Sequence, residues 1–122
     1  MNLIVVGAGK VGYYLVKTLL ARGNNVAVVE KERERCERLA QELGVLVIQG
    51  DGTAPQALAD AQADRAEVIA AVTGRDEDNL VACQVAKRLF GVGRAIARVN
   101  NPKNEAVLEA LGVDAAVSST SL

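Results

Sequence analysis

The stretch Val5-Val6-Gly7-Ala8-Gly9-Lys10-Val11-Gly12 contains a Gly-x-Gly-x-x-Gly pattern between an apolar segment and an amphipathic one. This order predicts a strand, a glycine-rich turn and a helix, the arrangement that binds pyrophosphate in dinucleotide-binding folds. Gly7 is expected to permit the tight turn, Gly9 to let the backbone approach a phosphate, and Gly12 to let helix and strand pack closely. Free amides and the positive end of the helix dipole would then attract the anion.

Apolar runs alternate with amphipathic stretches along the rest of the chain. The predicted strands are Leu3–Val6, Val26–Val29, Val45–Ile48, Val68–Val72, Ala95–Val99 and Ala115–Ser118. The predicted helices are Lys10–Ala21, Lys31–Leu43, a short helix from Pro55, Asp76–Phe90 and Asn104–Leu111. This alternation predicts right-handed crossovers and a six-stranded parallel sheet with helices on both faces. We therefore predict an α/β Rossmann fold of strand order 3-2-1-4-5-6, formed by residues 1–122 as one domain.

Local patterns predict how several helices begin and which way they face. Thr53 and Gln56 have the spacing of a capping box, so Thr53 is expected to cap the short third helix. Asp76 is the expected cap of the fourth helix, and Asn101 can cap the last one. Periodicity predicts that the inner face of the first helix consists of Val11, Leu15, Thr18 and Leu19.

Composition excludes several classes of function. The net charge of this 122-residue chain is −1, with acids and bases interspersed, and aromatic residues make up 2%, so nucleic-acid binding is not expected. No apolar run reaches the roughly 18 residues that a membrane span needs, and no leader precedes the first strand, which indicates a cytoplasmic protein. Cys36 and Cys83 are expected to be buried free thiols. Histidine is absent, which removes the commonest general base and metal ligand.

Glu30 lies at the end of the second predicted strand, where a carboxylate can accept hydrogen bonds from both hydroxyls of an adenosine ribose. Such a carboxylate repels a 2′-phosphate and so favours NAD over NADP. The alternative is that Glu30 is only a charged residue opening a charged helix, and Lys31 beside it could weaken the discrimination. Lys10 opposes the dipole of its own helix, which indicates either contact with a phosphate or simple exposure to solvent.

Further candidate residues follow the other strands, at the sheet edge where ligands bind. Asp51 could reach the adenine amino group or, with Gly52 and Thr53, simply form a turn. Thr73 could donate to a phosphate or ribose. The acids at residues 76–78 are expected to complement a helix dipole, with a hard cation as the alternative. No metal site is therefore predicted.

Arg98 is the least expected residue, because it interrupts an apolar strand near its carboxyl end. A buried charge is rarely left unpaired. A ligand phosphate, an acid such as Glu30 or Asp76, and a neighbouring subunit all remain open as its partner.

Taken together, these residues resemble the N-terminal domain of the Trk/Ktr potassium-uptake regulatory proteins, also called the RCK, KTN or TrkA-N domain. The resemblance covers essentially the whole chain. Besides the glycine stretch and Glu30, it rests on the segments 50–53, 71–73, 76–79, 97–101 and 111–114. It implies a cytoplasmic domain that binds NAD or NADH, or alternatively ATP, ADP or AMP. It also implies a homodimer that assembles into a higher ring, held at the inner face of the plasma membrane by a potassium channel or transporter subunit.

The resemblance assigns cofactor-binding roles to individual positions. The phosphate loop would consist of Gly7, Ala8, Gly9, Lys10, Val11 and Gly12. The ribose and adenine side would consist of Glu30, Lys31, Asp51, Gly52 and Thr53. The region around the phosphates, or a subunit contact, would include Thr73 and Arg98. The chain departs from the pattern at Lys10, where many members carry Arg, because Lys lacks the bidentate fork. It also ends where members usually continue into a connecting helix and a smaller lobe.

The function predicted from these observations is nucleotide sensing that controls potassium transport, without catalysis. Adenosine ligands would shift the domain between conformations by their differential affinity. The alternative is the cofactor domain of an NAD-dependent dehydrogenase or reductase, which needs a catalytic side chain beside the nicotinamide and a second domain. A scaffold whose glycine loop binds nothing is a third possibility.

Overall fold

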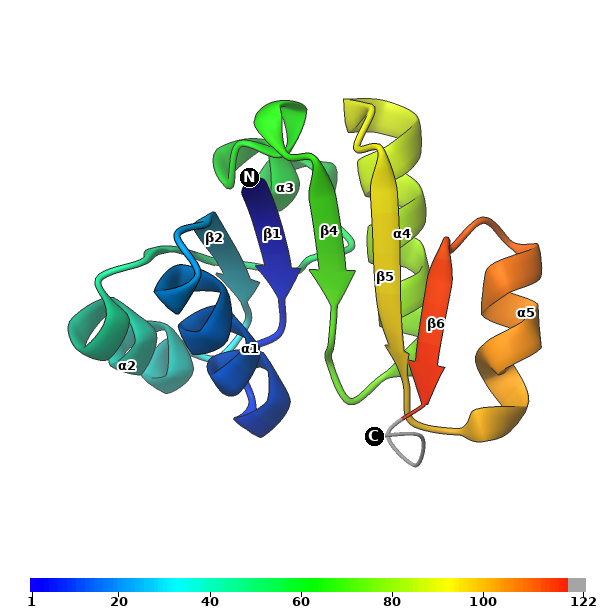
Figure 1. The fold of residues 1–122 in the computed structure, drawn as a ribbon, viewed down its shortest axis with the longest axis horizontal. Helices are drawn as coiled ribbons and strands as arrows, with labels where there is room; N and C mark the ends of the chain where they lie inside the picture. Colours follow the sequence, from blue (N-terminus) through cyan, green and yellow to red (C-terminus); the bar gives the residue numbers. More distant parts are fainter. Residues whose placement is uncertain (119–122) are drawn as a thin grey trace.

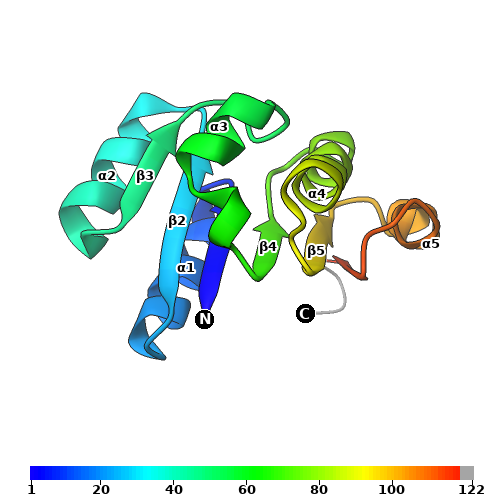
Figure 2. The same cartoon turned by 90° about the horizontal axis from the view of Figure 1, so that it is seen from above.

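The computed structural model, which describes residues 1–118, contains a six-stranded parallel sheet in the order β3-β2-β1-β4-β5-β6 (Figure 1, with β3 labelled in Figure 2). The strands are β1 Asn2–Val6, β2 Asn25–Glu30, β3 Leu46–Gln49, β4 Val68–Ala71, β5 Arg94–Val99 and β6 Ala115–Ser118. Val6 pairs with Val29 of β2 on one side and with Ala71 of β4 on the other. The predicted strand order and its switch point beside β1 are thus confirmed. The expected domain boundary at residue 122 lies outside the described residues.

Five helices connect these strands. They are α1 Lys10–Ala21, α2 Arg33–Leu43, α3 Pro55–Asp60, α4 Asp76–Phe90 and α5 Glu105–Ala110, with short 3-10 turns at Ala63–Arg65 and Pro102–Asn104. Seen from above, α3 and α4 lie along the same side of the strands (Figure 2). The last helix is shorter than the predicted Asn104–Leu111, because Pro102–Asn104 forms the 3-10 turn. Asn101 caps that turn rather than α5 itself, accepting a hydrogen bond from the Lys103 N–H at 3.1 Å.

Two apolar cores lie on opposite faces of the sheet. The smaller one packs α1 and α2 against the sheet and includes Val5, Val28, Val16 and Leu39. The larger one packs α3, α4 and α5 against the other face, where β4, β5 and α4 all contribute buried alanines. Ala71 and Ala97 on the strands and Ala82 and Ala86 on α4 are fully buried. Small side chains on both surfaces let α4 lie close to β4 and β5, which places the start of α4 beside the carboxyl ends of these strands.

The predicted inner face of α1 is confirmed only in part, because the helix is rotated about its axis. Gly12 and Val16 are its buried residues, Val11, Leu15 and Leu19 are half-buried and pack against the same core, and Thr18 is exposed. The cause is Gly12, where an added Cβ would overlap the Gly7 carbonyl oxygen. The helix therefore turns its glycine toward the strand, and Val16, one turn later, follows it into the core.

Asp114 connects the start of β6 to β5 and α4. Its Oδ2 accepts a hydrogen bond from the Lys87 ammonium at 2.6 Å and from the Ala95 N–H at 2.7 Å. These two donors hold the pKa of the Asp114 carboxyl below its usual value. Asp114, the last residue of the segment 111–114, thus has a structural role, far from the carboxyl ends of the strands.

We expect Asp114→Asn to lower the free energy of unfolding by about 1 kcal/mol near neutral pH. The substitution replaces the carboxylate that accepts from Lys87 and Ala95 with a neutral amide, which weakens both bonds at a partly exposed site. Because the folded pKa lies below the unfolded value of about 3.9, this contribution is present above that pH and is lost as the pH falls through the folded pKa. The difference between wild type and variant should therefore shrink in acid. Urea denaturation near pH 7 and near pH 3 measures it, and a difference that grows in acid contradicts this role.

Both cysteines are free and buried, as predicted. Burial raises the pKa of the Cys83 thiol to about 12, so that thiol stays protonated and unreactive. Within residues 1–118, none of the helices has the length and apolar character needed to cross a membrane.

Candidate functional site

A cavity of about 500 Å³ lies at the carboxyl ends of the strands, at the point where the strand order reverses. It brings together most of the residues predicted from the sequence. The predicted residues that line it are Gly7, Gly9, Lys10, Glu30, Lys31, Asp51, Gly52, Thr53, Thr73 and Arg98. Ala8, Val11 and Gly12 do not line the cavity, although all three belong to the glycine turn or to α1 and help to shape it.

The glycine turn between β1 and α1 is the tightest part of the wall. Gly7 has φ +100°, which favours glycine, and a Cβ there would lie 3.0 Å from the Thr73 nitrogen. Gly9 precedes α1, and no described side chain caps the helix, so amides of its first turn stay free for a ligand. With the helix dipole, these amides make the start of α1 suited to an anion.

Glu30 is 5% exposed, and both of its carboxylate oxygens are held by backbone amides. Oε1 accepts from the Ala8 N–H of the glycine turn at 2.6 Å, and Oε2 accepts from the Glu32 N–H at 2.8 Å. These bonds contradict the alternative that Glu30 is only a charged residue at the start of a charged helix. Each oxygen retains a further lone pair, so the carboxylate can still accept hydrogen bonds from a ligand in the cavity.

The Gly50–Thr53 segment forms a tight turn after β3. Oδ1 of Asp51 accepts from the Thr53 N–H at 2.9 Å and from the Thr53 hydroxyl at 2.7 Å, and these bonds hold the pKa of Asp51 below its usual value. Gly52 is buried against β1, where a Cβ would overlap the Val6 side chain. The interpretation that Asp51 forms a turn with Gly52 and Thr53 is thus correct. Asp51 also lines the cavity.

The predicted cap of α3 is wrong. Ala54 is the residue that precedes the helix, and it makes no side-chain cap. The Thr53 hydroxyl donates to Asp51, and the Gln56 amide donates instead to Asp60 at 2.8 Å. Because the helix begins at Pro55, Thr53 lies one residue before the cap position, and its hydroxyl stabilises the turn instead.

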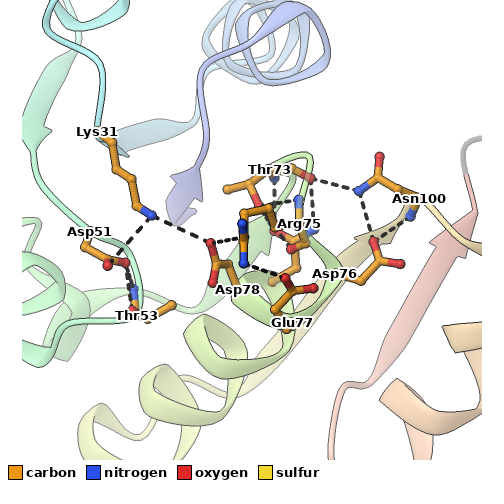
Figure 3. A network of polar contacts seen from close by, with 10 residues as sticks. Lys31, Asp51, Thr53, Thr73, Arg75, Asp76, Glu77, Asp78 and Asn100 are labelled. Atoms are coloured by element: carbon orange, nitrogen blue, oxygen red, sulfur yellow. Dashed lines mark hydrogen bonds and ion pairs between the residues drawn. The ribbon is translucent and has the colours of Figure 1, made fainter.

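Charged side chains form a chain of ion pairs along one part of the cavity wall, and Lys31, Asp51, Arg75 and Asp78 belong to it (Figure 3). Nζ of Lys31 lies 3.8 Å from Oδ2 of Asp51 and 3.7 Å from Oδ2 of Asp78, while Arg75 pairs with Asp78 at 3.3 Å and with Glu77 at 2.8 Å. Glu77 and Asp78 at the start of α4 thus face cations, and the described residues contain no cluster suited to a metal ion. Because these pairs are largely exposed, each is worth little to stability.

Two cations in the cavity lack an acidic partner among residues 1–118. Lys10 is exposed at the start of α1, and the structure shows no ion pair for it. Arg98 is half-buried on β5, and its buried Nε has no hydrogen-bond partner in the described part of the chain. An arginine with a buried, unsatisfied donor beside a cavity is suited to an anionic ligand.

The acids proposed as partners of Arg98 are engaged elsewhere, so that interpretation is wrong. Glu30 binds the glycine turn, as described above. Asp76 accepts from the backbone N–H groups of Asn100 at 2.7 Å and Asn101 at 3.0 Å. For the same reason Asp76 does not cap α4, where Arg75 is the preceding residue and no side chain caps the helix.

Sequence reasoning missed several residues of the cavity wall: Val6, Val29, Glu32, Arg35, Gly50, Val72, Gly74, Arg75 and Asp78. Arg35 lies on the polar face of α2, and helical periodicity alone reads it as solvent-facing. Its guanidinium pairs with Glu32 at 2.8 Å and lies 3.9 Å from Oε1 of Glu30. Its place at the site depends on how α2 lies beside the glycine turn, for which the sequence carries no local signal.

Comparison with known proteins agrees with this geometry. Residues 3–119 match the family model of the TrkA-N domain. The chain belongs to the TrkA-N domain family. It is 37% identical over 118 residues to the Trk system potassium uptake protein TrkA homolog of Methanothermobacter thermautotrophicus, covering 97% of this chain and 54% of that protein. It is 36% identical over 111 residues to TrkA of Vibrio alginolyticus, covering 91% of this chain and 24% of that one. This TrkA-N domain thus spans about half of the first relative and a quarter of the second.

Solved structures share the fold of this TrkA-N domain. The NAD(P)-binding domain of an exopolyphosphatase-related protein from Archaeoglobus fulgidus has a TM-score of 0.85 at 28% identity, over 97% of this chain and 87% of that one. The TrkA-N domain of Escherichia coli inner membrane protein ybaL has a TM-score of 0.89 at 23% identity (98% and 87% covered). The GsuK channel bound to NAD has 0.83 at 24% identity (95% and 21% covered). The last two similarities, at this identity, establish the fold alone.

Proposed function

We propose that this TrkA-N domain binds an adenine nucleotide and thereby regulates a potassium channel or transporter. The observation that carries the proposal is the switch-point cavity. The uncapped start of α1, the held carboxylate of Glu30, and the cations Lys10 and Arg98 all meet there. This set offers an anion site, an acceptor for hydroxyl groups and two positive charges, which fit a phosphorylated nucleoside.

The proposed pose follows the chemistry of the wall. The first phosphate lies on the glycine turn at the start of α1, and the ribose hydroxyls donate to Glu30. Asp51 lies on the adenine side, and Thr73 and Arg98 face the groups beyond the first phosphate. We favour NAD or NADH, with ATP, ADP or AMP as alternatives that share the adenosine phosphate. NAD is also the ligand in the GsuK channel structure of the same fold.

We infer a sensing role rather than catalysis. The sequence has no histidine, and the pKa of Asp51 is lowered by the Thr53 bonds, which makes that carboxyl a poor general base near neutral pH. Bound nucleotide would shift the domain between conformations according to its affinity for each. Oxidation of NADH with keto acids as substrates would overturn this part of the proposal.

The proposed partner is a membrane subunit that conducts potassium, because the curated relatives are proteins of the Trk potassium uptake system. The domain would lie at the cytoplasmic face of the plasma membrane, held there by that subunit. We also propose that copies of the chain form a dimer that assembles into a ring. Four large apolar side chains exposed on or beside α4 and α5 support such a contact: Val81, Leu89, Val107 and Leu111.

We expect Arg98→Gln to weaken the binding of NAD and ADP about tenfold, since a charge-assisted contact to phosphate is lost. The free energy of unfolding should change little, because the Arg98 side chain has no hydrogen-bond or ion-pair partner among the described residues. Isothermal titration calorimetry measures the affinity. Arg94→Gln is the matched control: it removes the same charge from the amino end of β5, outside the cavity. Equal affinities in all three proteins would contradict the role of Arg98, and a wild type that binds no adenine nucleotide would refute the proposed function.

A further inference from the structure

Asp76, the first residue of α4, is 6% exposed and accepts four hydrogen bonds. Oδ1 accepts from the backbone N–H and the side-chain amide of Asn100 at 2.7 and 2.9 Å, and Oδ2 accepts from the Asn101 N–H at 3.0 Å and the Asn104 amide at 2.9 Å. Burial alone would raise the pKa of Asp76, but these donors outweigh it and lower the pKa. All four bonds reach the segment that leads from β5 into α5. The Asp76 carboxylate therefore holds the segment between β5 and α5 in place and does not cap α4, the helix to which Asp76 belongs.

Asn79, one turn further along α4, is fully buried and uses both ends of its amide. Oδ1 accepts from the Thr73 N–H at 3.0 Å and from the Thr73 hydroxyl at 2.6 Å. Nδ2 donates to the carbonyl oxygens of Thr73 at 3.1 Å and Arg98 at 2.9 Å. Asn79 thus joins the ends of β4 and β5 at Thr73 and Arg98, which both line the cavity.

The two sets of bonds meet at Thr73. Its carbonyl oxygen accepts from the amide of Asn79 and, at 3.1 Å, from the amide of Asn100, which itself donates to Asp76 (Figure 3). The cavity wall is therefore connected through partly buried polar contacts to Asn104, the residue that immediately precedes α5. Such satisfied networks rigidify the elements that they join.

We propose that Asp76 and Asn79 are positioning residues of the nucleotide site, which hold Thr73 and Arg98 in place and transmit occupancy of the cavity to the start of α5. The inference rests on the proposed function. Neither residue lines the cavity, so their effect on a ligand acts through Thr73 and Arg98. In the proposed pose these two residues contact the groups beyond the first phosphate, while Glu30 and Asp51 contact the adenosine on the opposite side of the switch point.

Asp76→Asn tests the proposal, because the amide keeps the shape but replaces one acceptor with a donor that faces N–H groups. We expect the dissociation constant for ADP to rise about tenfold, the size usual for coupling between neighbouring sites. The dissociation constant for adenosine, followed by NMR titration, should change less than about twofold, within the usual error of additive effects. In the wild type, ADP should slow hydrogen exchange of the α5 amides Glu105–Ala110, and in the variant this protection should be lost.

The matched control is Asp114→Asn, which makes the same substitution at a carboxylate that also joins β5 to neighbouring elements, at the far end of the strand. It should lower stability without changing the affinity for ADP. A milder variant, Asn104→Ala, removes one donor to Asp76 from outside the cavity and should weaken ADP binding about twofold to threefold even where Asp76→Asn does not fold.

Three results would overturn the inference: unchanged ADP affinity in Asp76→Asn, equal weakening of ADP and adenosine, or equal weakening by Asp114→Asn. If Asp76→Asn does not fold, unchanged ADP affinity in Asn104→Ala overturns it as well. These outcomes leave the proposed function intact, because the wild type still binds ADP. A wild type that binds neither ADP nor NAD would instead refute the proposed function, and the inference with it.

Discussion

A Gly12→Ala variant is expected to lose at least about 3 kcal/mol of the free energy of unfolding, together with its affinity for adenine nucleotides. The added Cβ would overlap the Gly7 carbonyl oxygen, which is backbone and cannot rotate away. The start of α1 must then move from the glycine turn, and the anion site between them is lost. Urea denaturation and calorimetry with NAD measure the two effects, and the melting temperature should fall by about 10 °C or more.

Gly74→Ala is the matched control for this prediction. Gly74 also lines the cavity, but a Cβ there meets no atom within 4 Å. Its replacement should leave both stability and NAD affinity close to the wild-type values. If Gly12→Ala behaves like Gly74→Ala, the close approach at Gly12 does not decide the geometry of the phosphate site.

The strand order and the location of the site could be predicted because both depend on short-range patterns. In β1, β2 and β4 the apolar runs 3–6, 26–29 and 68–72 are bounded by polar or glycine residues, so their limits are visible in the sequence. Once the strands are parallel, their carboxyl ends meet at one edge. Residues as far apart as Glu30, Asp51 and Thr73 must then lie near one another.

The errors occur where a tertiary contact competes with a local rule. Asp76 and Thr53 both have the residue type of a helix cap and lie within one residue of the cap position, yet each bonds elsewhere. The donors to Asp76 lie 24 to 28 residues later in the chain, and no local pattern announces them. Likewise the rotation of α1 follows from one close approach at Gly12, which hydrophobic periodicity does not describe. Partners of charged residues, such as Lys31 with Asp78, depend on distances that only the folded chain sets.

Glu30→Gln is expected to lower the affinity for NAD at least about thirtyfold, which corresponds to about 2 kcal/mol of binding free energy. In the folded protein the two carboxylate oxygens accept from Ala8 and Glu32. The substituted amide would direct N–H groups at one of these donors and would lose acceptor positions for the ribose hydroxyls, so binding and stability should both fall. Loss of the negative charge should also reduce the preference for NAD over NADP, because a 2′-phosphate is no longer repelled. Calorimetry with both dinucleotides measures affinity and preference together.

Glu32→Gln separates this role from a general effect of charge. Glu32 lines the same cavity two residues later, but its side chain is exposed and pairs with Arg35. The substitution removes the same charge from the same wall and leaves in place the backbone amides of Ala8 and Glu32, which donate to the Glu30 carboxylate. It should therefore change NAD affinity little and leave the preference over NADP intact. If Glu32→Gln weakens NAD as much as Glu30→Gln does, the cavity selects its ligand by overall charge, and the assignment of the ribose to Glu30 is wrong.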